Sequence, residues 1–155
     1  MTSPAPSPPP TLDGLPFVDE HVVDTPAAPA DVWRAVVATF GNQSAGAVQY
    51  ARLVGADPVD TSGTMPELGA TVAGFRVAEV RPEEMLLLTG RHRFSSYALQ
   101  FVVEAHDGAT RLRALTYSTF PGLLGAAYRA VVITSGAHHL VVGRMLRGVA
   151  ARASR

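Results

Sequence analysis

Four β-strands are predicted by one stretch of the sequence, TVAGFRVAEVRPEEMLLLTGRHRFSSYALQFVVEAHDGATRLRALTYSTF (71–120). Short runs rich in valine, leucine, phenylalanine and tyrosine are separated by turn residues, which is typical of an antiparallel meander. The predicted strands cover residues 71–80, 84–92, 93–105 and 110–120, and the predicted turns cover 81–83 and 106–109. The meander decides the fold class, because every other predicted element has to pack against it.

The last two of these strands alternate between apolar and polar side chains. Successive side chains of a strand point to opposite faces of a sheet. One face collects Tyr97, Leu99, Phe101, Val103, Leu112, Ala114, Thr116 and Ser118, and the other collects Gln100, Glu104, Arg111 and Arg113. One face of the sheet is therefore predicted to be buried, and the other to meet water.

A long helix is predicted after Pro121 and Gly122, from about Leu123 to the C-terminus. At about 3.6 residues per turn, one stripe collects mostly apolar side chains. The stripe consists of Leu124, Tyr128, Val131, Ser135, His138, Val142, Met145 and Val149. Arg129, Arg144 and Arg147 fall on the opposite side. The helix is therefore expected to lie across the meander, with this stripe against the sheet.

The residues before the meander predict one strand and one longer helix. LPFVDEHVV (15–23) reads as a strand, and in the helix that follows Pro29 suits the first turn and Gly41 the end. Val32, Trp33, Val36, Val37 and Phe40 recur in this helix at helical spacing. Between residues 42 and 69 the sequence predicts a short helix around 45–53, followed by turns.

Residues 1–14 are rich in proline and offer few side chains for a core. A segment of this composition favours an extended chain. We therefore expect a disordered tail at 1–14 and a single domain at 15–150, since about 100–200 residues usually share one core.

The predicted order is a strand, a helix, an irregular link, a meander and a long helix. This order is typical of the α+β class, with helices on one face of a curved antiparallel sheet. A straight helix and a curved sheet cannot touch along their whole lengths, so we expect a cavity between them. Such cavities bind small apolar molecules.

Several stretches resemble the helix-grip superfamily (SRPBCC), which includes START lipid-transfer domains, polyketide cyclases and birch-pollen-allergen-like proteins. FVDEHVVDTPAAPADVWRAV (17–36) is similar to the strand, turn and helix that open these domains. Similarity to bacterial members of unknown function extends over GFRVAEV (74–80), LLLTGRHRFSSYALQF (86–101), TRLRALTYSTFPGLLGAAYRA (110–130) and HHLVVGRML (138–146). The resemblance covers residues 15–150 and implies a curved antiparallel sheet wrapped around a long C-terminal helix. It implies no single activity, because the scaffold carries many.

Residues 42–69 depart from the pattern of this superfamily. Its members place a short helical pair and their second and third strands there, whereas this sequence has Gly-Asp-Pro and Thr-Ser-Gly-Thr-Met-Pro. The departure concerns the lid of the implied ligand pocket.

Charge and composition exclude several classes of partner. Thirteen basic and thirteen acidic residues cancel, so attraction to nucleic acid or to anionic lipid is not expected. No run of about 20 apolar residues predicts a membrane span, and the N-terminus lacks the basic start and apolar core of a signal peptide. We therefore expect a cytoplasmic protein.

Two adjacent histidines, His138 and His139, raise the question of a metal site. Neighbours on a helix project about 100° apart, whereas helical metal ligands need a spacing of three or four residues. The positions at that spacing are Thr134, Ser135, Val142 and Gly143, none of them a good ligand. A site would need His21, His92 or His106 brought in from strands or turns, so we expect no metal.

Other catalytic chemistry is not predicted either. The absence of cysteine excludes disulfides and a cysteine nucleophile, and the absence of lysine excludes Schiff-base chemistry. The sequence contains no G-x-S-x-G elbow and no glycine-rich phosphate loop. We expect neither a catalytic residue nor a cofactor.

A few polar side chains are candidates for contact with a ligand in the cavity. Those on the predicted buried faces are Tyr97, Thr116, Tyr128, Ser135 and His138. His92 is a further candidate, because with a neighbouring arginine it could hold a carboxylate at the cavity mouth. In the alternative interpretation the tyrosines are core aromatics, His138 is a neutral core histidine bonded to a backbone carbonyl, and residues 91–93 are a solvated turn.

A small apolar patch is predicted on the arginine-bearing side of the long helix, from Ile133 and Leu140 with Gly136 and Gly143 nearby. Glycine costs about 1 kcal/mol inside a helix, so two of them suggest the close approach of another backbone. One hypothesis is a homodimer contact. The other is coverage by the N-terminal segment or by the 42–69 link.

Three functions are compatible with these observations. The first is a soluble protein that binds a small hydrophobic molecule between the sheet and the C-terminal helix. The second is an enzyme of the polyketide cyclase or dehydratase type, in which His138 with Tyr97 or Tyr128 moves protons. The third is an interaction module with a filled core.

Overall fold

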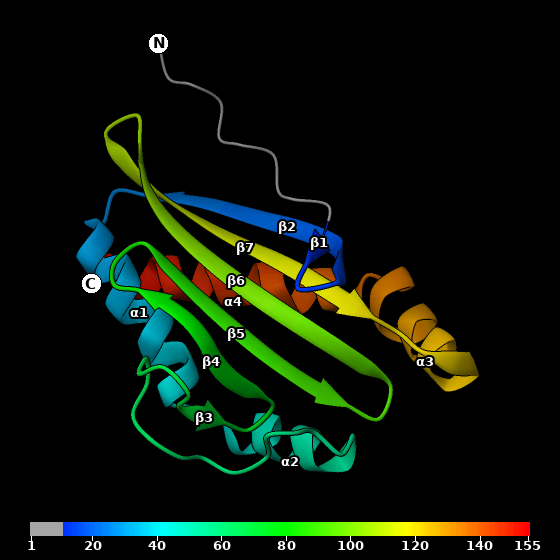
Figure 1. The fold of residues 1–155 in the computed structure, drawn as a ribbon. Coiled ribbons are helices and arrows are strands. Elements are labelled where there is room, and N and C mark those ends of the chain that lie inside the picture. Colours follow the sequence, from blue (N-terminus) through cyan, green and yellow to red (C-terminus); the bar gives the residue numbers. More distant parts are fainter. Residues whose placement is uncertain (1–10) are drawn as a thin grey trace.

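The computed structural model describes residues 11–155, and Figure 1 shows its elements. The strands are β1 (Thr11–Leu12), β2 (Leu15–Thr25), β3 (Thr71–Val72), β4 (Phe75–Arg81), β5 (Met85–His92), β6 (Ser95–His106) and β7 (Ala109–Thr119). The helices are α1 (Pro29–Gly41), α2 (Ala45–Leu53), α3 (Gly122–Arg129) and α4 (Ala137–Ala153), with a π-helical turn at Ala130–Thr134.

The described residues form one seven-stranded antiparallel sheet in the order β1-β2-β7-β6-β5-β4-β3. Helices α1 and α4 pack against each other and on one face of the sheet. In Figure 1, α4 runs behind the strands along the length of the sheet. The predicted α+β class, a curved antiparallel sheet with a C-terminal helix on one face, is confirmed.

Strands β5, β6 and β7 follow the predicted meander, because alternation and turn residues are local signals. The stretch predicted as one strand at 71–80 is two strands, β3 and β4, joined by a turn in which Gly74 has a φ of 89°. Helix α2 has the predicted bounds, and residues 54–70, all within the described part, form no strand beyond isolated bridges.

The ordered domain begins earlier than predicted. The expected tail at 1–14 includes Thr11 and Leu12, which pair with Pro16 and Leu15 of β2. This pairing extends the sheet to residues before Leu15, the boundary that composition suggested. For residues 1–10 the expected disorder lies outside the residues that the structure describes.

The main core lies between the sheet and helices α1 and α4. Phe101 of β6 is 1% exposed and contacts the ring of Phe40 in α1 edge-on, at 5.4 Å between centroids. The other fully buried members from strands and helices include Val32, Val36, Val77, Leu86, Leu88, Leu112, Leu146 and Val149. Of these, Val32, Val36, Leu112 and Val149 had been predicted to be buried from their spacing, as had Phe101.

The opposite face of the sheet is also partly apolar, which alternation did not predict. Leu115 and Tyr117 are buried there and pack with Phe17 and with the side chains of β1. Arg113 was expected to meet water but is 7% exposed. Its guanidinium pairs with Glu20 of β2, 2.5 Å from Nε to Oε1, so a neighbouring carboxylate permits burial of the charge.

The C-terminal helix is not continuous, which corrects the predicted helix from Leu123 to the end. It breaks at Ser135 and Gly136, where Gly136 has a φ of 81° and begins α4. The predicted stripe faces the sheet only after this break. Leu124 and Val131 are 71% and 69% exposed, because α3 lies beyond the end of the sheet (Figure 1).

This break changes the basis of the predicted homodimer patch. Gly136 is explained by its left-handed φ, which glycine adopts without steric cost, rather than by the approach of another backbone. Gly143 faces β2, where a Cβ would lie 3.9 Å from Nδ1 of His21. Ile133 is half-buried and Leu140 is exposed. The contact through these four residues stays a prediction.

Within residues 11–155, every helix is too short or too polar to cross a bilayer.

Candidate functional site

The predicted ligand-contacting residues gather at one end of the helix-facing side of the sheet. In the β6–β7 pairing, Tyr97 lies opposite Ser118 and Leu99 lies opposite Thr116. Tyr97 and Thr116 are therefore diagonal neighbours on this face, with Cα atoms about 7–8 Å apart. The β5–β6 turn, α3 and the start of α4 all lie at this end, to the right in Figure 1.

Four rings, which we call the aromatic group, meet beside the β5–β6 turn: His92, Phe94, Tyr97 and Tyr128. The ring of Tyr128 stacks on Phe94, with centroids 5.2 Å apart, and stands edge-on to His92 at 4.8 Å. His92 and Tyr97 lie 5.5 Å apart. The group thus joins the hairpin of β5 and β6 to α3, which follows β7 in the sequence.

The position of Tyr97 depends on a glycine in the neighbouring strand. Its hydroxyl donates a hydrogen bond of 2.7 Å to the carbonyl of Gly74. Both groups lie over Gly90, where a Cβ would stand 2.1 Å from that carbonyl and 2.9 Å from the tyrosine ring. Burial raises the pKa of Tyr97 to about 12, so the phenol is a neutral donor at physiological pH.

The hydroxyls of Tyr128 and Tyr50 share a hydrogen bond of 2.5 Å, which links α3 to α2. Burial and this bond raise the pKa of Tyr128. Around the pair, the two helices expose the apolar side chains of Leu53, Leu123 and Leu124. Two helices at the margin of the sheet are thus joined by a polar contact next to the aromatic group.

His92 is held as a neutral acceptor. Its Nδ1 accepts a hydrogen bond of 3.1 Å from the backbone N–H of Phe94, which assigns the proton to Nε2. Burial lowers the pKa of His92 from the ordinary value of 6.5. The buried ring therefore disfavours the charged form in the folded state.

We expect His92→Asn to reduce the loss of stability in mild acid. Because the pKa of His92 is lower in the folded chain than in the unfolded chain, the unfolded chain binds more protons below about pH 6.5, and stability falls as pH drops through that window. The asparagine retains an acceptor near Nδ1 but does not titrate. The measurement is urea denaturation at about pH 7.5 and 5.0. Equal losses in the two proteins would contradict the expectation.

A second cluster, the Asp–His group (Asp19, His21, Thr116, His138 and His139), lies between β2, β7 and α4. A β-bulge between Phe17 and Asp19 builds it. Phe17 pairs with Tyr117 on the outer face, whereas Asp19 pairs with Thr116 on the helix-facing side. Residues two apart normally share a face, so the bulge turns Asp19 toward the helix.

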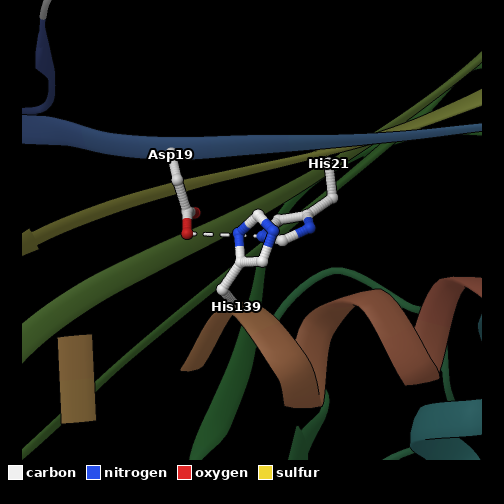
Figure 2. Close-up of side chains that lie close together, drawn as sticks. All are labelled: Asp19, His21 and His139. Atoms are coloured by element: carbon white, nitrogen blue, oxygen red, sulfur yellow. Dashed lines mark hydrogen bonds and ion pairs between the residues drawn. The ribbon is translucent and has the colours of Figure 1, made fainter. Parts of the chain in front are cut away.

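The side chains of the Asp–His group point toward one another, and Figure 2 shows three of them. Asp19 Oδ2 lies 3.3 Å from His21 Nε2, and the rings of His21 and His139 are 4.3 Å apart. On the other side of the carboxylate, Asp19 Oδ1 lies 3.5 Å from His138 Nε2, which also contacts Thr116 Oγ1 at 3.2 Å. One carboxylate therefore lies between histidines from two elements.

Asp19 is ionised in this setting. Burial by itself raises the pKa of Asp19, but the interactions with His138, Thr116 and His21 together outweigh it and lower the pKa. Its Oδ1 is buried and makes no well-formed hydrogen bond to the described residues. The carboxylate thus has capacity to bind a further donor or a cation.

The structure separates the predicted residues into these two groups and leaves one outside. Ser135 is exposed, its hydroxyl bonded to the carbonyl of Val131 and accepting from the N–H of Ala137. Ser135 lies at the break before α4, where the predicted stripe is interrupted, so its side chain does not join either group. His139 was expected at the edge of the helix, but it lies against His21, because β2 passes over the first turn of α4.

Sequence reasoning missed Asp19 as a site residue and considered His21 only as a distant metal ligand. A signal was present in Asp19-Glu20-His21, because residues two apart on a strand share one face. It gave no indication that the face meets the start of a helix more than 100 residues later. Tyr50 and Phe94 carried no signal that distinguishes them from ordinary apolar residues.

Two hollows of about 270 and 370 Å³ stand out among the described residues. Both are polar and lie at the β4 side of the sheet, sharing Asp57, Pro58 and Arg76. Arg91 lines the smaller one and is bonded to Asp57 by two nitrogens, at 2.9 and 2.7 Å. Neither lies between the sheet and α4, so the cavity expected there stays a prediction.

The fold is shared by solved structures of low sequence identity. A protein from Rhizobium leguminosarum is 15% identical with a TM-score of 0.55, covering 88% of this chain and 95% of its own. TTHA0849 from Thermus thermophilus is 18% identical with a TM-score of 0.50, covering 89% and 97%. Ara h 8.0201, a Bet v 1-like protein, is 11% identical with a TM-score of 0.50, covering 87% and 95%. These likenesses confirm the helix-grip fold.

No curated protein matches the chain in sequence. A family model with the description "Protein of unknown function (DUF2867)" matches residues 11–145. This match begins at β1 and ends within α4, so it includes both the aromatic group and the Asp–His group. The chain therefore belongs to the DUF2867 family, and it has the helix-grip fold.

Proposed function

We propose that the protein binds a small hydrophobic molecule at the end of the sheet where the aromatic group faces the start of α4. The carrying observation is the proximity of five predicted residues there. His92, Tyr97 and Tyr128 are in ring contact, and Thr116 and His138 are in contact one row along the sheet. Rings with a few polar groups are the usual lining of small-molecule sites.

The chemistry of this surface favours a neutral, flat, mainly apolar ligand. The aromatic group offers ring faces and edges, which attract other aromatic systems. Neutral phenols and a neutral imidazole serve as its polar groups, so a charged ligand gains little from them. The hydroxyl of Thr116 and the ring of His138 could orient one polar substituent. Aromatic polyketides are therefore the first compounds to test, and fatty acids, which are flexible and charged, are the comparison class.

Helices α2 and α3 provide a route of entry. They meet beside the aromatic group through the hydrogen bond between Tyr50 and Tyr128. Leu53 and Leu124 lie one helical turn from the two tyrosines and are exposed, so they form an apolar rim next to that bond. To enter, a ligand has to break one hydrogen bond between two helices at the margin of the sheet. The free energy this costs is small compared with the gain from covering apolar surface.

The enzymatic alternative is less well supported. It needs His138 next to Tyr97 or Tyr128, but among the described residues His138 contacts Thr116 and Asp19. The hydroxyl of Tyr97 is used by the carbonyl of Gly74. We therefore propose a binding protein, with turnover as an outcome that the experiments would detect.

The test begins with native mass spectrometry of the protein freshly purified from its own host. We expect a bound small molecule, and a higher melting temperature in the presence of aromatic polyketides or fatty acids. A ligand present at a concentration of about 100 times its Kd raises the free energy of unfolding by about 2.7 kcal/mol. The proposal is overturned if nothing is bound and no compound of the panel changes the melting temperature, a result that favours the interaction module.

Two variants of α3 locate the site. Tyr128→Ala removes a ring of the aromatic group, and we expect the affinity for the ligand to fall about tenfold, near the upper end for an aromatic contact. Leu123→Ala is the matched control, because this side chain is 90% exposed on the same helix. Equal affinities in the two variants would place the ligand elsewhere. Loss of turnover in His138→Gln with affinity retained would instead favour the enzyme.

A further inference from the structure

We propose that Asp19, His21 and His139 form a binding site for a divalent transition metal, Zn²⁺ by its ligand chemistry, with one coordination position open. This site is separate from the aromatic group, and its test does not depend on the proposed hydrophobic ligand.

The geometry of the three side chains carries the proposal. One ligand atom from each of them can be chosen so that all lie within 4.8 Å of one another. Tetrahedral bonds of about 2.0–2.2 Å place ligand atoms about 3.3–3.6 Å apart. Asp19 Oδ2 and His21 Nε2 already stand at 3.3 Å. His139 is exposed and comes from the first turn of α4, so a rotation of its side chain closes the site (Figure 2).

Two backbone features build this cluster. The bulge between Phe17 and Asp19 turns Asp19 toward α4, on the side opposite to Phe17, and His21 shares that face because it lies two residues further on. The left-handed Gly136 ends the preceding helical segment and starts α4 so that His139 lies in its first turn, opposite β2. Gly143, one turn further, faces the same histidine, since a Cβ there would stand 3.9 Å from Nδ1 of His21. Bulges are frequent next to functional sites because they redirect a side chain.

The donor set indicates the metal. Two imidazoles and one carboxylate suit Zn²⁺ and its transition-metal neighbours, whereas Mg²⁺ and Ca²⁺ prefer oxygen ligands throughout. Three protein ligands with an exposed side are typical of zinc sites that keep a position for water or substrate. Closed structural sites use four protein ligands instead.

An outer layer of contacts orients the proposed carboxylate ligand. Asp19 Oδ1 faces His138 Nε2 at 3.5 Å, and Thr116 Oγ1 contacts the same nitrogen at 3.2 Å. Ligating carboxylates are usually held by such outer partners. With Oδ2 on the metal, this contact holds the other oxygen and sets the orientation of the carboxylate.

Two features oppose a cation at this position and limit the affinity. The N-terminus of α4 carries a partial positive charge. Arg147 lies close to Gly143, on the Nδ1 side of His21. The negative charge of the Asp19 carboxylate has to offset both of these positive charges. The alternative is a metal-free network, in which Asp19 serves only as the ion-pair partner of the histidines.

The experiment is titration of the full-length, chelator-treated protein with Zn²⁺ by calorimetry, and with Co²⁺ by visible absorption. We expect one ion per chain, a Co²⁺ spectrum of four-coordinate type, and a higher melting temperature with Zn²⁺. Mg²⁺ and Ca²⁺ should produce none of these. In His139→Ala and Asp19→Asn, the Zn²⁺ affinity should fall by more than the roughly 10–100-fold that loss of an outer partner causes.

His106→Ala is the matched control, because His106 also pairs with an aspartate, Nε2 to Oδ2 of Asp107 at 3.4 Å. Its Zn²⁺ affinity should equal that of the wild type. His139→Ala changes an exposed side chain, so loss of binding in a variant with unchanged circular dichroism reports on the ligand. The metal-free network is established instead if Zn²⁺ fails to bind, or if His139→Ala and His106→Ala bind it as well as the wild type.

Discussion

Phe101→Ala is expected to lower the free energy of unfolding by about 3–5 kcal/mol, the usual cost of removing a buried phenylalanine ring. Phe101 is 1% exposed in the middle of β6, and its ring meets Phe40 of α1. β6 is paired with β5 and β7, and α1 packs on β6, so neither element can move locally to fill the cavity that the missing ring leaves. Urea denaturation followed by circular dichroism measures the change.

The control for this variant is Leu123→Ala, which removes a large apolar side chain that is 90% exposed. Its effect on the free energy of unfolding should stay within about 0.5 kcal/mol. A loss below about 1.5 kcal/mol in Phe101→Ala would show that the layer between α1 and the sheet rearranges around the missing ring.

Gly90→Ala is the second variant with a large expected effect, about 3 kcal/mol of lost stability, at the upper end for an overpacked site. The new Cβ would stand 2.1 Å from the carbonyl oxygen of Gly74, which is backbone and belongs to the turn before β4. To make room, the β3–β4 turn has to move away from β5, and the hydrogen bond from Tyr97 is lost. We therefore expect weaker ligand binding as well as a lower melting temperature.

Gly148→Ala is the matched control for Gly90→Ala. Gly148 lies in α4, where a Cβ would meet nothing within 4 Å. The same substitution should there raise the free energy of unfolding by about 0.5–1 kcal/mol, because alanine is the better helix former. A Gly90→Ala protein as stable as the wild type would mean that the β3–β4 turn adapts freely.

The predictable parts of the fold are those whose signals are local. Strands β5, β6 and β7 and helices α1 and α2 follow from alternation, helical spacing and turn residues within each segment. The errors occurred where a distant element decides. β1 forms because the outer face of β7 carries Leu115 and Tyr117, which need cover. Arg113 is buried because Glu20 of another strand pairs with it.

The candidate site was predictable to a similar degree. Tyr97, Thr116 and His138 were identified because alternation on a strand or spacing on a helix assigns each to one face. Ser135 was predicted to face the sheet because the helix was taken as continuous, but the helix is interrupted at Gly136 and Ser135 lies at the break. The neighbours across elements, such as Tyr50 for Tyr128 and His21 for His139, could not be obtained from spacing at all.

By itself, then, the sequence determined the class of the fold, the meander, the helix-facing side of β6 and β7, and the absence of cysteine and lysine chemistry. Only the tertiary structure decided which side chains meet. A bulge of one residue in β2 and a left-handed glycine before α4 together bring Asp19, His21 and His139 to one place. Periodicity assigns a side chain to a face, but it is long-range pairing that brings two faces together, and no local pattern of residues encodes that pairing.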